Sequence, residues 1–296
     1  MKKKWMTMDH RACEAAILLL LVGLAFGVRL AFLSLSGAWG TPPADDGIEY
    51  QILATNLATG RGYVTPEGEP YVFRPPGYPI FLAPIYALFG PQPDAARLAN
   101  ILISALTCLP VYAFARRLWN WKVGLIAAAG IAFHPLLIYL TGLLYPESIT
   151  LFLIALCFYL SLLARQSGKV WPLILLAISL AGLVYLRPNF LIWALALVVW
   201  AIAAFSMWTN RLRAIIIMVA GTLLLIAPWS LRNYLAFDEF AWMSTNGGVT
   251  FWASNNPLSD GGWIEPGPST WLRDNPPADL RGWPGLSPQQ SERRFQ

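Results

Sequence analysis

Three carboxylates in this sequence precede stretches that look helical. Asp45 and Asp46 come before the run 48–59, and Glu147 stands in the segment LLYPESITLF. The first turn of a helix favours a carboxylate, because its backbone N–H groups are unpaired and its dipole end is positive. A helix cap is therefore one interpretation of these acids. The other is a general base, which accepts a proton from a reacting hydroxyl.

Three arginines stand at the ends of apolar stretches. They are Arg74 in FRPPGYP, Arg187 in YLRPNF and Arg232 in PWSLRNY. A long basic side chain at such a place can simply extend its charge from an apolar surface into water. Arginine also suits phosphate, because its planar guanidinium donates paired hydrogen bonds. Carboxylates and arginines beside a hydrophobic body suit a reaction on a lipid-linked phosphate.

Apolar helices must position these residues. Of the 296 residues 56% are hydrophobic and 12% are charged, about half the charged share of a soluble domain. Mean hydropathy is +0.51. Most apolar residues fall in uninterrupted blocks, which excludes intrinsic disorder, collagen-like and coiled-coil chains and a disulfide scaffold. We predict an all-α, polytopic membrane protein.

A helix needs roughly 20 apolar residues to cross the bilayer core. Seven stretches qualify as spans: 15–36, 97–115, 123–141, 148–164, 170–186, 190–209 and 214–231. An eighth apolar stretch, 77–90, has fourteen residues and contains Pro79 and Pro84. We predict an interfacial or re-entrant helix there.

The basic residues predict the orientation of the spans. With the N-terminal MKKKWMTMDHR in the cytoplasm, the loops 116–122, 165–169 and 210–213 also lie inside and hold seven basic residues and no acid. Fourteen of the sixteen acids then lie outside. We predict a plasma (inner) membrane protein with a cytoplasmic N-terminus. The net charge of +5 belongs largely to these anchors, so membrane lipids are expected partners and nucleic acid is not.

The chain divides into two predicted parts. Residues 1–231 form the transmembrane domain, with an outer catalytic loop at 37–76 and the interfacial helix at 77–90. Residues 232–296 form an extracytoplasmic tail rich in Pro, Gly and Trp. The three cysteines and two histidines share no metal-ligand spacing.

Several short motifs follow one another along the chain. Asp46 to Tyr50 reads D-x-x-x-Y and is followed by A-x-x-L and a glycine pair, and Arg74 precedes two prolines. Further motifs are Ala96-Arg97-x-x-Asn100, Arg116-Arg117, Glu147-Ser148, PWSLRNY and STNGG…NNP. With these motifs the sequence resembles the GT-C superfamily of membrane glycosyltransferases. It is most similar to glycosyltransferase family 39, the branch of protein O-mannosyltransferases and the lipid A aminoarabinose transferase.

The resemblance implies a GT-C-type helical bundle whose outer first loop carries juxtamembrane helices. It also implies transfer of a sugar from a polyprenyl-phosphate carrier to an acceptor hydroxyl, by a single inverting displacement on the extracytoplasmic face. The family's first-loop aspartate is the base, and its basic residue before Pro-Pro contacts the carrier phosphate. The resemblance thus gives Asp46, the less favoured Asp45 and Glu147 as catalytic candidates, and Arg74 as the residue that contacts the carrier phosphate. The charge of Arg187 and Arg232 and their place on the outer side add these two as phosphate-binding candidates. Tyr50, the tyrosine of the first-loop motif, is a further candidate for binding the donor.

The sequence leaves several alternatives open. The acceptor is a glycan, a lipid or a protein, and a divalent metal joins the site if the paired acids act as they do in related oligosaccharide transferases. Glu49 stands where the aminoarabinose branch carries a basic residue, so that branch's substrate is not implied. Family members continue with further spans, so a truncated gene, a fragment or a short divergent member is expected. A non-catalytic assembly partner and a transporter of lipid-linked intermediates are the competing functions.

Overall fold

The computed structural model describes the backbone of residues 2–255 and, within it, the side chains of 12–248, 250, 251 and 255. Every regular element in that part of the chain is a helix, and its one strand-like pairing is a bridge between Val64 and Pro70. The all-α class is confirmed. The elements are α1 (Lys2–Leu35), α2 (Asp46–Ala58), α3 (Gly77–Phe89), α4 (Pro93–Leu106), α5 (Cys108–Leu118), α6 (Trp121–Ala132), α7 (Pro135–Leu140), α8 (Glu147–Ser167), α9 (Trp171–Leu186), η1 (Pro188–Leu191), α10 (Ile192–Ala204), α11 (Trp208–Phe237) and α12 (Gly247–Asn255).

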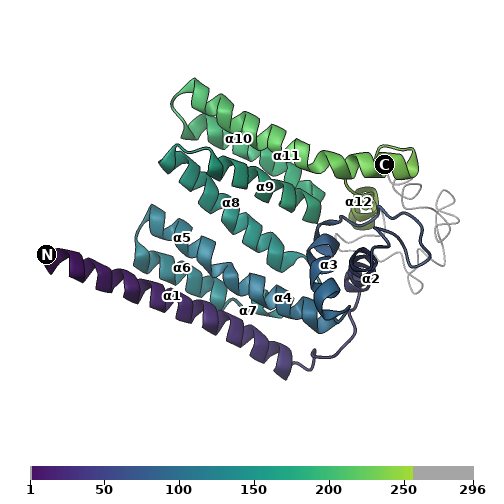
Figure 1. Cartoon of the computed structure of the whole chain (residues 1–296), viewed down its shortest axis with the longest axis horizontal. Helices are drawn as coiled ribbons and strands as arrows, with labels where there is room; N and C mark the ends of the chain where they lie inside the picture. Colours follow the sequence, from purple (N-terminus) through teal and green to yellow (C-terminus); the bar gives the residue numbers. More distant parts are fainter. Residues whose placement is uncertain (1, 256–296) are drawn as a thin grey trace.

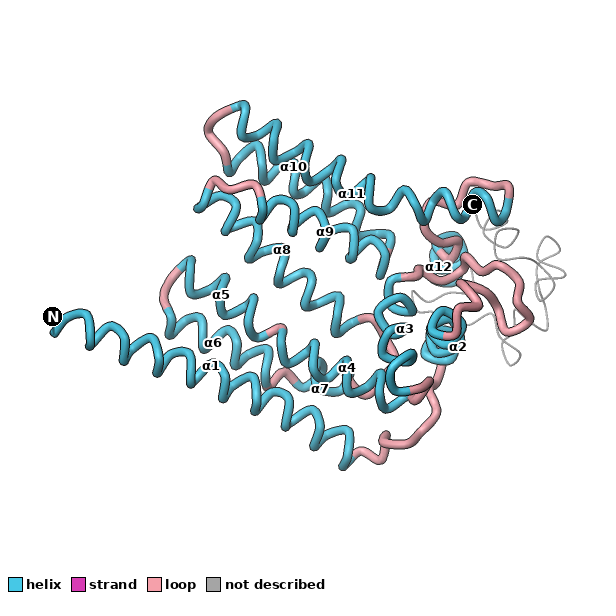
Figure 2. Tube along the Cα trace, in the orientation of Figure 1, coloured by secondary structure: helices cyan, strands magenta, loops and turns pink. Residues whose placement is uncertain are grey.

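The long helices run along one axis of the molecule, and α2, α3 and α12 gather at the end away from the N-terminus (Figure 1). The connections α5–α6, α8–α9 and α10–α11 all lie at the N-terminal end (Figure 2). The basic segments 116–122, 165–169 and 210–213 therefore share one end of the bundle. The acidic first loop lies at the other end.

Four helical segments of the described chain are long and apolar enough to cross a membrane. They are Ala12–Leu35, Pro93–Leu118, Glu147–Ser167 and Trp208–Phe237. The predicted spans 123–141, 170–186 and 190–209 correspond to shorter apolar helices. A multi-pass membrane bundle is thus confirmed, and the number of seven crossings stays a prediction.

A break between α6 and α7 explains a buried arginine that the sequence analysis did not consider. Pro135 has no N–H, so the carbonyl of Ile131 lacks the helical donor it would otherwise have. Arg29 of α1 is fully buried and donates to the carbonyls of Ile131 at 3.0 Å and Ala132 at 2.8 Å. It also donates to Ser104 Oγ on α4, at 2.9 Å. Because unpaired carbonyls are costly in an apolar interior, Arg29 stabilises the junction of α1, α4 and α6.

The elements around the predicted domain boundary differ in part from expectation. α3 coincides with the predicted interfacial helix at 77–90. The boundary at 231 falls inside α11, which continues to Phe237. α12 belongs to the predicted tail, and the rest of that tail, 256–296, lies outside the described residues.

Candidate active site

α2 presents two acids, Asp46 in its first position and Glu49 one turn later. Asp45 occupies the N-cap position with φ of 48°, but its side chain makes no capping hydrogen bond. The Asp46 carboxylate instead binds Arg74, which follows it by 28 residues in the chain. A cap therefore does not account for Asp46.

The Arg74 guanidinium joins both acids of α2. Its Nη2 and Nη1 donate to the two carboxylate oxygens of Asp46 at 2.6 and 3.1 Å, and its Nε donates to Glu49. Burial alone would lower the pKa of Arg74, but the attraction of Glu49 and Asp46 outweighs burial and raises that pKa. Three of the five N–H groups of the guanidinium take part in these bonds, so the arginine is charged and firmly held.

A second ion pair joins the start of α8 to the end of α9. Glu147 opens α8 and binds Arg187, the residue that follows α9. Oε2 of Glu147 is buried and has no hydrogen-bond partner in the described part of the chain. The Arg187 side chain is 48% exposed, whereas that of Arg74 is 19% exposed. Arg187 is therefore the more accessible of the two cations.

Two glycines let the elements that carry these ion pairs approach closely. A Cβ on Gly77 of α3 would lie only 2.6 Å from the carbonyl carbon of Tyr185, two residues before Arg187. A Cβ on Gly47 of α2 would lie 3.2 Å from the Cβ of Leu144, just before α8. The absence of side chains at both positions thus brings the first loop against the ends of α8 and α9.

Both ion pairs line one open cavity of about 530 Å³. Tyr50 lies in its wall and is 6% exposed. Burial raises the pKa of Tyr50 to about 12, and the charges that act on it are those of Arg74, Asp46, Arg187 and Glu147. Tyr50 is therefore a neutral hydroxyl among four charged groups at neutral pH. Other polar or aromatic groups in the wall are Tyr145, Asn189, Trp242, Ser244, Asn246, Thr250 and Phe251.

Five of the seven predicted site residues meet in this cavity: Asp46, Tyr50, Arg74, Glu147 and Arg187. Asp45 and Arg232 do not line it.

Arg232 has a different environment from the one predicted. It donates to the carbonyls of Tyr71 at 2.8 Å and Tyr63 at 2.7 Å, and its guanidinium lies 5.1 Å from the centre of the Trp229 ring. Backbone carbonyls and aromatic rings therefore hold this arginine outside the lining of the cavity, and its assignment to the donor phosphate stays an untested prediction. Arg232 ties α11 to the first loop.

Sequence reasoning missed the partners that complete the site. Glu49 received no role, although its position three residues after Asp46 places both acids on one helix face. Of the segment 242–251, only the motif at 244–248 was noted in the sequence and it received no role, yet the segment forms part of the cavity wall. The Thr245 N–H donates to the carbonyl of Val72 at 3.2 Å and so anchors that segment beside the first loop.

A divalent metal at the site stays a prediction. No three His, Cys, Asp or Glu side chains among the described residues come close enough to share an ion. The two acids of α2 both bind the Arg74 guanidinium.

The family of dolichyl-phosphate-mannose-protein mannosyltransferases matches residues 73–231. The chain belongs to this family. The match includes Arg74, Glu147 and Arg187, and Asp46 lies before it.

Two curated relatives support the same grouping. The chain is 29% identical over 222 residues to undecaprenyl phosphate-alpha-4-amino-4-deoxy-L-arabinose arabinosyl transferases of Pseudomonas aeruginosa and of Pseudomonas paraeruginosa. Each match covers 70% of this chain and 39% of the relative. The chain therefore corresponds to well under half the length of these relatives.

Solved structures confirm the GT-C-type fold. The oligosaccharyltransferase of Archaeoglobus fulgidus in its apo form is similar with a TM-score of 0.62 and 15% identity, over 78% of this chain and 30% of that one. The same enzyme tethered to an acceptor peptide with the NVT sequon gives a TM-score of 0.61 and 14% identity, over 78% and 31%. At this low sequence identity, the similarity of these structures to this chain concerns the fold alone.

Proposed function

We propose that this chain carries the sugar-transfer site of a membrane glycosyltransferase whose donor is a polyprenyl-phosphate sugar. One observation carries the proposal: Asp46–Arg74 and Glu147–Arg187 line a single open cavity at one end of an apolar bundle. The family name refers to dolichyl-phosphate mannose and the relatives' name to an undecaprenyl-phosphate sugar, which supports this donor class.

Arg74 and Arg187 are the groups that we assign to the donor phosphate. The phosphate gains negative charge as its bond to the sugar breaks, and donors already in position stabilise that charge. Both guanidiniums are held in place by carboxylates before any donor binds. The apolar helices beside the cavity provide an apolar environment for the polyprenyl tail.

Asp46 is the proposed general base. Its carboxylate accepts two hydrogen bonds from Arg74, and a phosphate that binds Arg74 competes for the same N–H groups. Donor binding therefore frees Asp46 to accept the proton of the acceptor hydroxyl. The acceptor oxygen then attacks the anomeric carbon, the bond from that carbon to the phosphate oxygen breaks, and the electron pair leaves with the polyprenyl phosphate. A single displacement inverts the anomeric configuration.

The same arrangement of residues supports proposals for the sugar, the acceptor and the orientation in the membrane. We propose a hexose or pentose as the transferred sugar and a hydroxyl of a glycan, lipid or protein as the acceptor. The connections α5–α6, α8–α9 and α10–α11 lie at the end of the bundle opposite to α2 and α3 (Figure 2). The cavity is lined by residues of α2 and of the ends of α8 and α9. This arrangement supports a plasma (inner) membrane protein with its N-terminus in the cytoplasm and its site on the extracytoplasmic side.

A transfer assay tests the proposal. Purified protein is incubated with a radiolabelled polyprenyl-phosphate sugar and candidate acceptors. Asp46→Asn removes the proton-accepting carboxylate while keeping its size, and we expect transfer to fall by about 10²–10⁴-fold.

Two further variants serve as controls in this assay. Glu67→Gln removes an exposed acid of the same loop that lies outside the cavity, and we expect wild-type transfer. Full transfer by Asp46→Asn together with loss in Asp45→Asn would move the base to Asp45. Wild-type transfer by both Asp variants would overturn the base assignment.

A further inference from the structure

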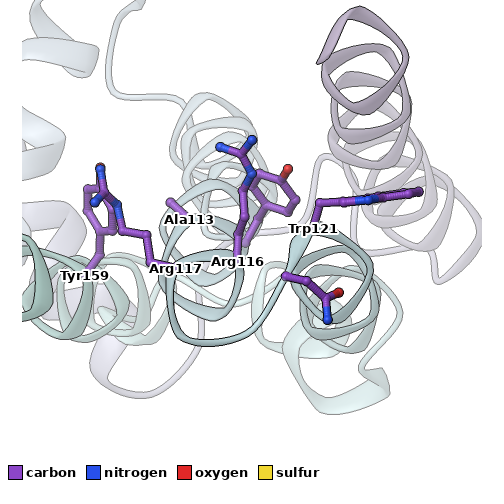
Figure 3. A pocket seen from close by; sticks show the side chains of 7 residues that line it. Ala113, Arg116, Arg117, Trp121 and Tyr159 are labelled. Atoms are coloured by element: carbon purple, nitrogen blue, oxygen red, sulfur yellow. The ribbon is translucent and has the colours of Figure 1, made fainter. Parts of the chain in front are cut away.

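A second polar cavity, of about 580 Å³, lies at the end of the bundle opposite to the candidate site. The end of α5, the start of α6 and the side of α8 form its wall. In the view of Figure 3, Arg116 lies between Arg117 and Trp121, and Tyr159 lies beside Arg117. The sequence analysis treated the two arginines only as a motif and as loop charges.

One of the two arginines is fixed by an acid. Arg116 Nε lies 2.6 Å from Glu14 on α1, and Nη2 donates to the same carboxylate at 3.1 Å. The Tyr112 hydroxyl also donates to Glu14. The charge of Arg116 is therefore largely balanced, and its side chain forms a rigid side of the cavity.

The other arginine has only neutral partners among the described residues. Arg117 Nη1 donates to the Gln166 side-chain oxygen at 2.9 Å, and the guanidinium lies 5.6 Å from the centre of the Tyr159 ring. No described acid lies within ion-pair distance of it. The two contacts orient the guanidinium and leave most of its N–H groups available for a planar array of oxygens.

The surroundings of the cavity are those of a lipid headgroup. Leu118, Trp119 and Phe158 neighbour lining residues in the chain and are exposed, and Trp121 in the wall of the cavity is 40% exposed. Aromatic side chains with one polar edge are favoured at headgroup depth, and basic pockets between membrane helices bind anionic headgroups. We infer that this cavity binds the phosphate of an anionic lipid in the leaflet at the N-terminal end of the bundle. The inference is independent of the proposed sugar transfer.

Lipid retention tests the inference. The full chain is placed in nanodiscs of mixed phosphatidylglycerol and phosphatidylcholine, and the lipids that remain bound after detergent extraction are identified by native mass spectrometry. We expect the wild-type protein to retain phosphatidylglycerol in preference to phosphatidylcholine. Arg117→Gln should reduce that retention by about tenfold, because a charge-assisted hydrogen bond to phosphate is lost.

Two comparisons make this test decisive. Arg213→Gln removes one charge from the same end of the bundle but outside the cavity, where Arg213 binds Asn210 and the Gly168 carbonyl. It should retain phosphatidylglycerol like the wild type, and an equal loss in both variants would overturn the inference in favour of a diffuse positive field. Displacement of the lipid by equimolar inorganic phosphate would assign the cavity to a free anion and overturn the lipid assignment.

Discussion

Arg74 and Arg187 at the site end of the bundle have different partners from Arg117 at the N-terminal end. At the site end, Arg74 and Arg187 are both bound to carboxylates of the cavity region, where three acids face two arginines. At the N-terminal end, Arg117 has only neutral partners among the described residues. An ion pair can exchange its carboxylate for a substrate phosphate during a reaction, whereas a cation without an acid suits steady binding of an anion. The groups that bind an arginine therefore indicate its function better than the presence of the arginine alone.

Two further arginines make the same point. Arg29 and Arg232 donate to backbone carbonyls, and neither forms an ion pair among the described residues. Both hold helices or loops together. A basic residue near a helix end can thus be structural, reactive or ligand-binding, according to what surrounds it.

The largest expected contrast is between Arg74 and Arg232. Arg74→Ala removes the proposed donor to the leaving phosphate and leaves two acids unpaired, so we expect transfer to fall on the order of 10²–10³-fold, with weaker donor binding. Arg232→Ala should lower thermal stability and leave the dissociation constant of the donor unchanged. If both folded variants lost donor affinity equally, the proposed difference between a donor-binding Arg74 and a structural Arg232 would be contradicted.

A smaller effect is expected where the first loop meets α9. Gly77→Ala places a Cβ against the Tyr185 backbone, and such overpacking costs about 1–3 kcal/mol of stability. Gly130 on α6 has no atom within 4 Å of its added Cβ, so Gly130→Ala is the matched control and should not destabilise. The melting temperatures of the two variants measure the difference, and identical values would contradict the close contact.

The smallest effect concerns two helix starts at opposite ends of the bundle. Asn120 caps α6 by accepting hydrogen bonds from the N–H groups of Lys122 and Val123. Gln92 stands at the start of α4 and makes no such bond. Asn120→Ala should cost about 1 kcal/mol of stability, and Gln92→Ala much less. Chemical unfolding in detergent compares the two, and an equal cost would show that the cap of α6 contributes nothing.

Local signals predicted much of the fold, because uninterrupted apolar runs and the position of lysines depend on the chain alone. The short helix at 77–90 also followed from its length and prolines. The break at Pro135 and its compensation by Arg29 did not, since the two residues meet only after α1 packs against α6. The Asp46–Arg74 pair likewise depends on how the first loop folds back on α2. Residue type suggested the same role for Arg232 as for Arg74, and only tertiary contacts separated them.

Donor affinity of Asp46→Asn tests the central claim most directly. If Arg74 is exchanged between Asp46 and the donor phosphate, the variant loses a competitor for the guanidinium. We therefore predict that it binds the polyprenyl-phosphate sugar at least as tightly as the wild type while its transfer falls by about 10²–10⁴-fold. Loss of donor binding together with transfer would contradict the exchange and reduce Asp46 to a support for Arg74.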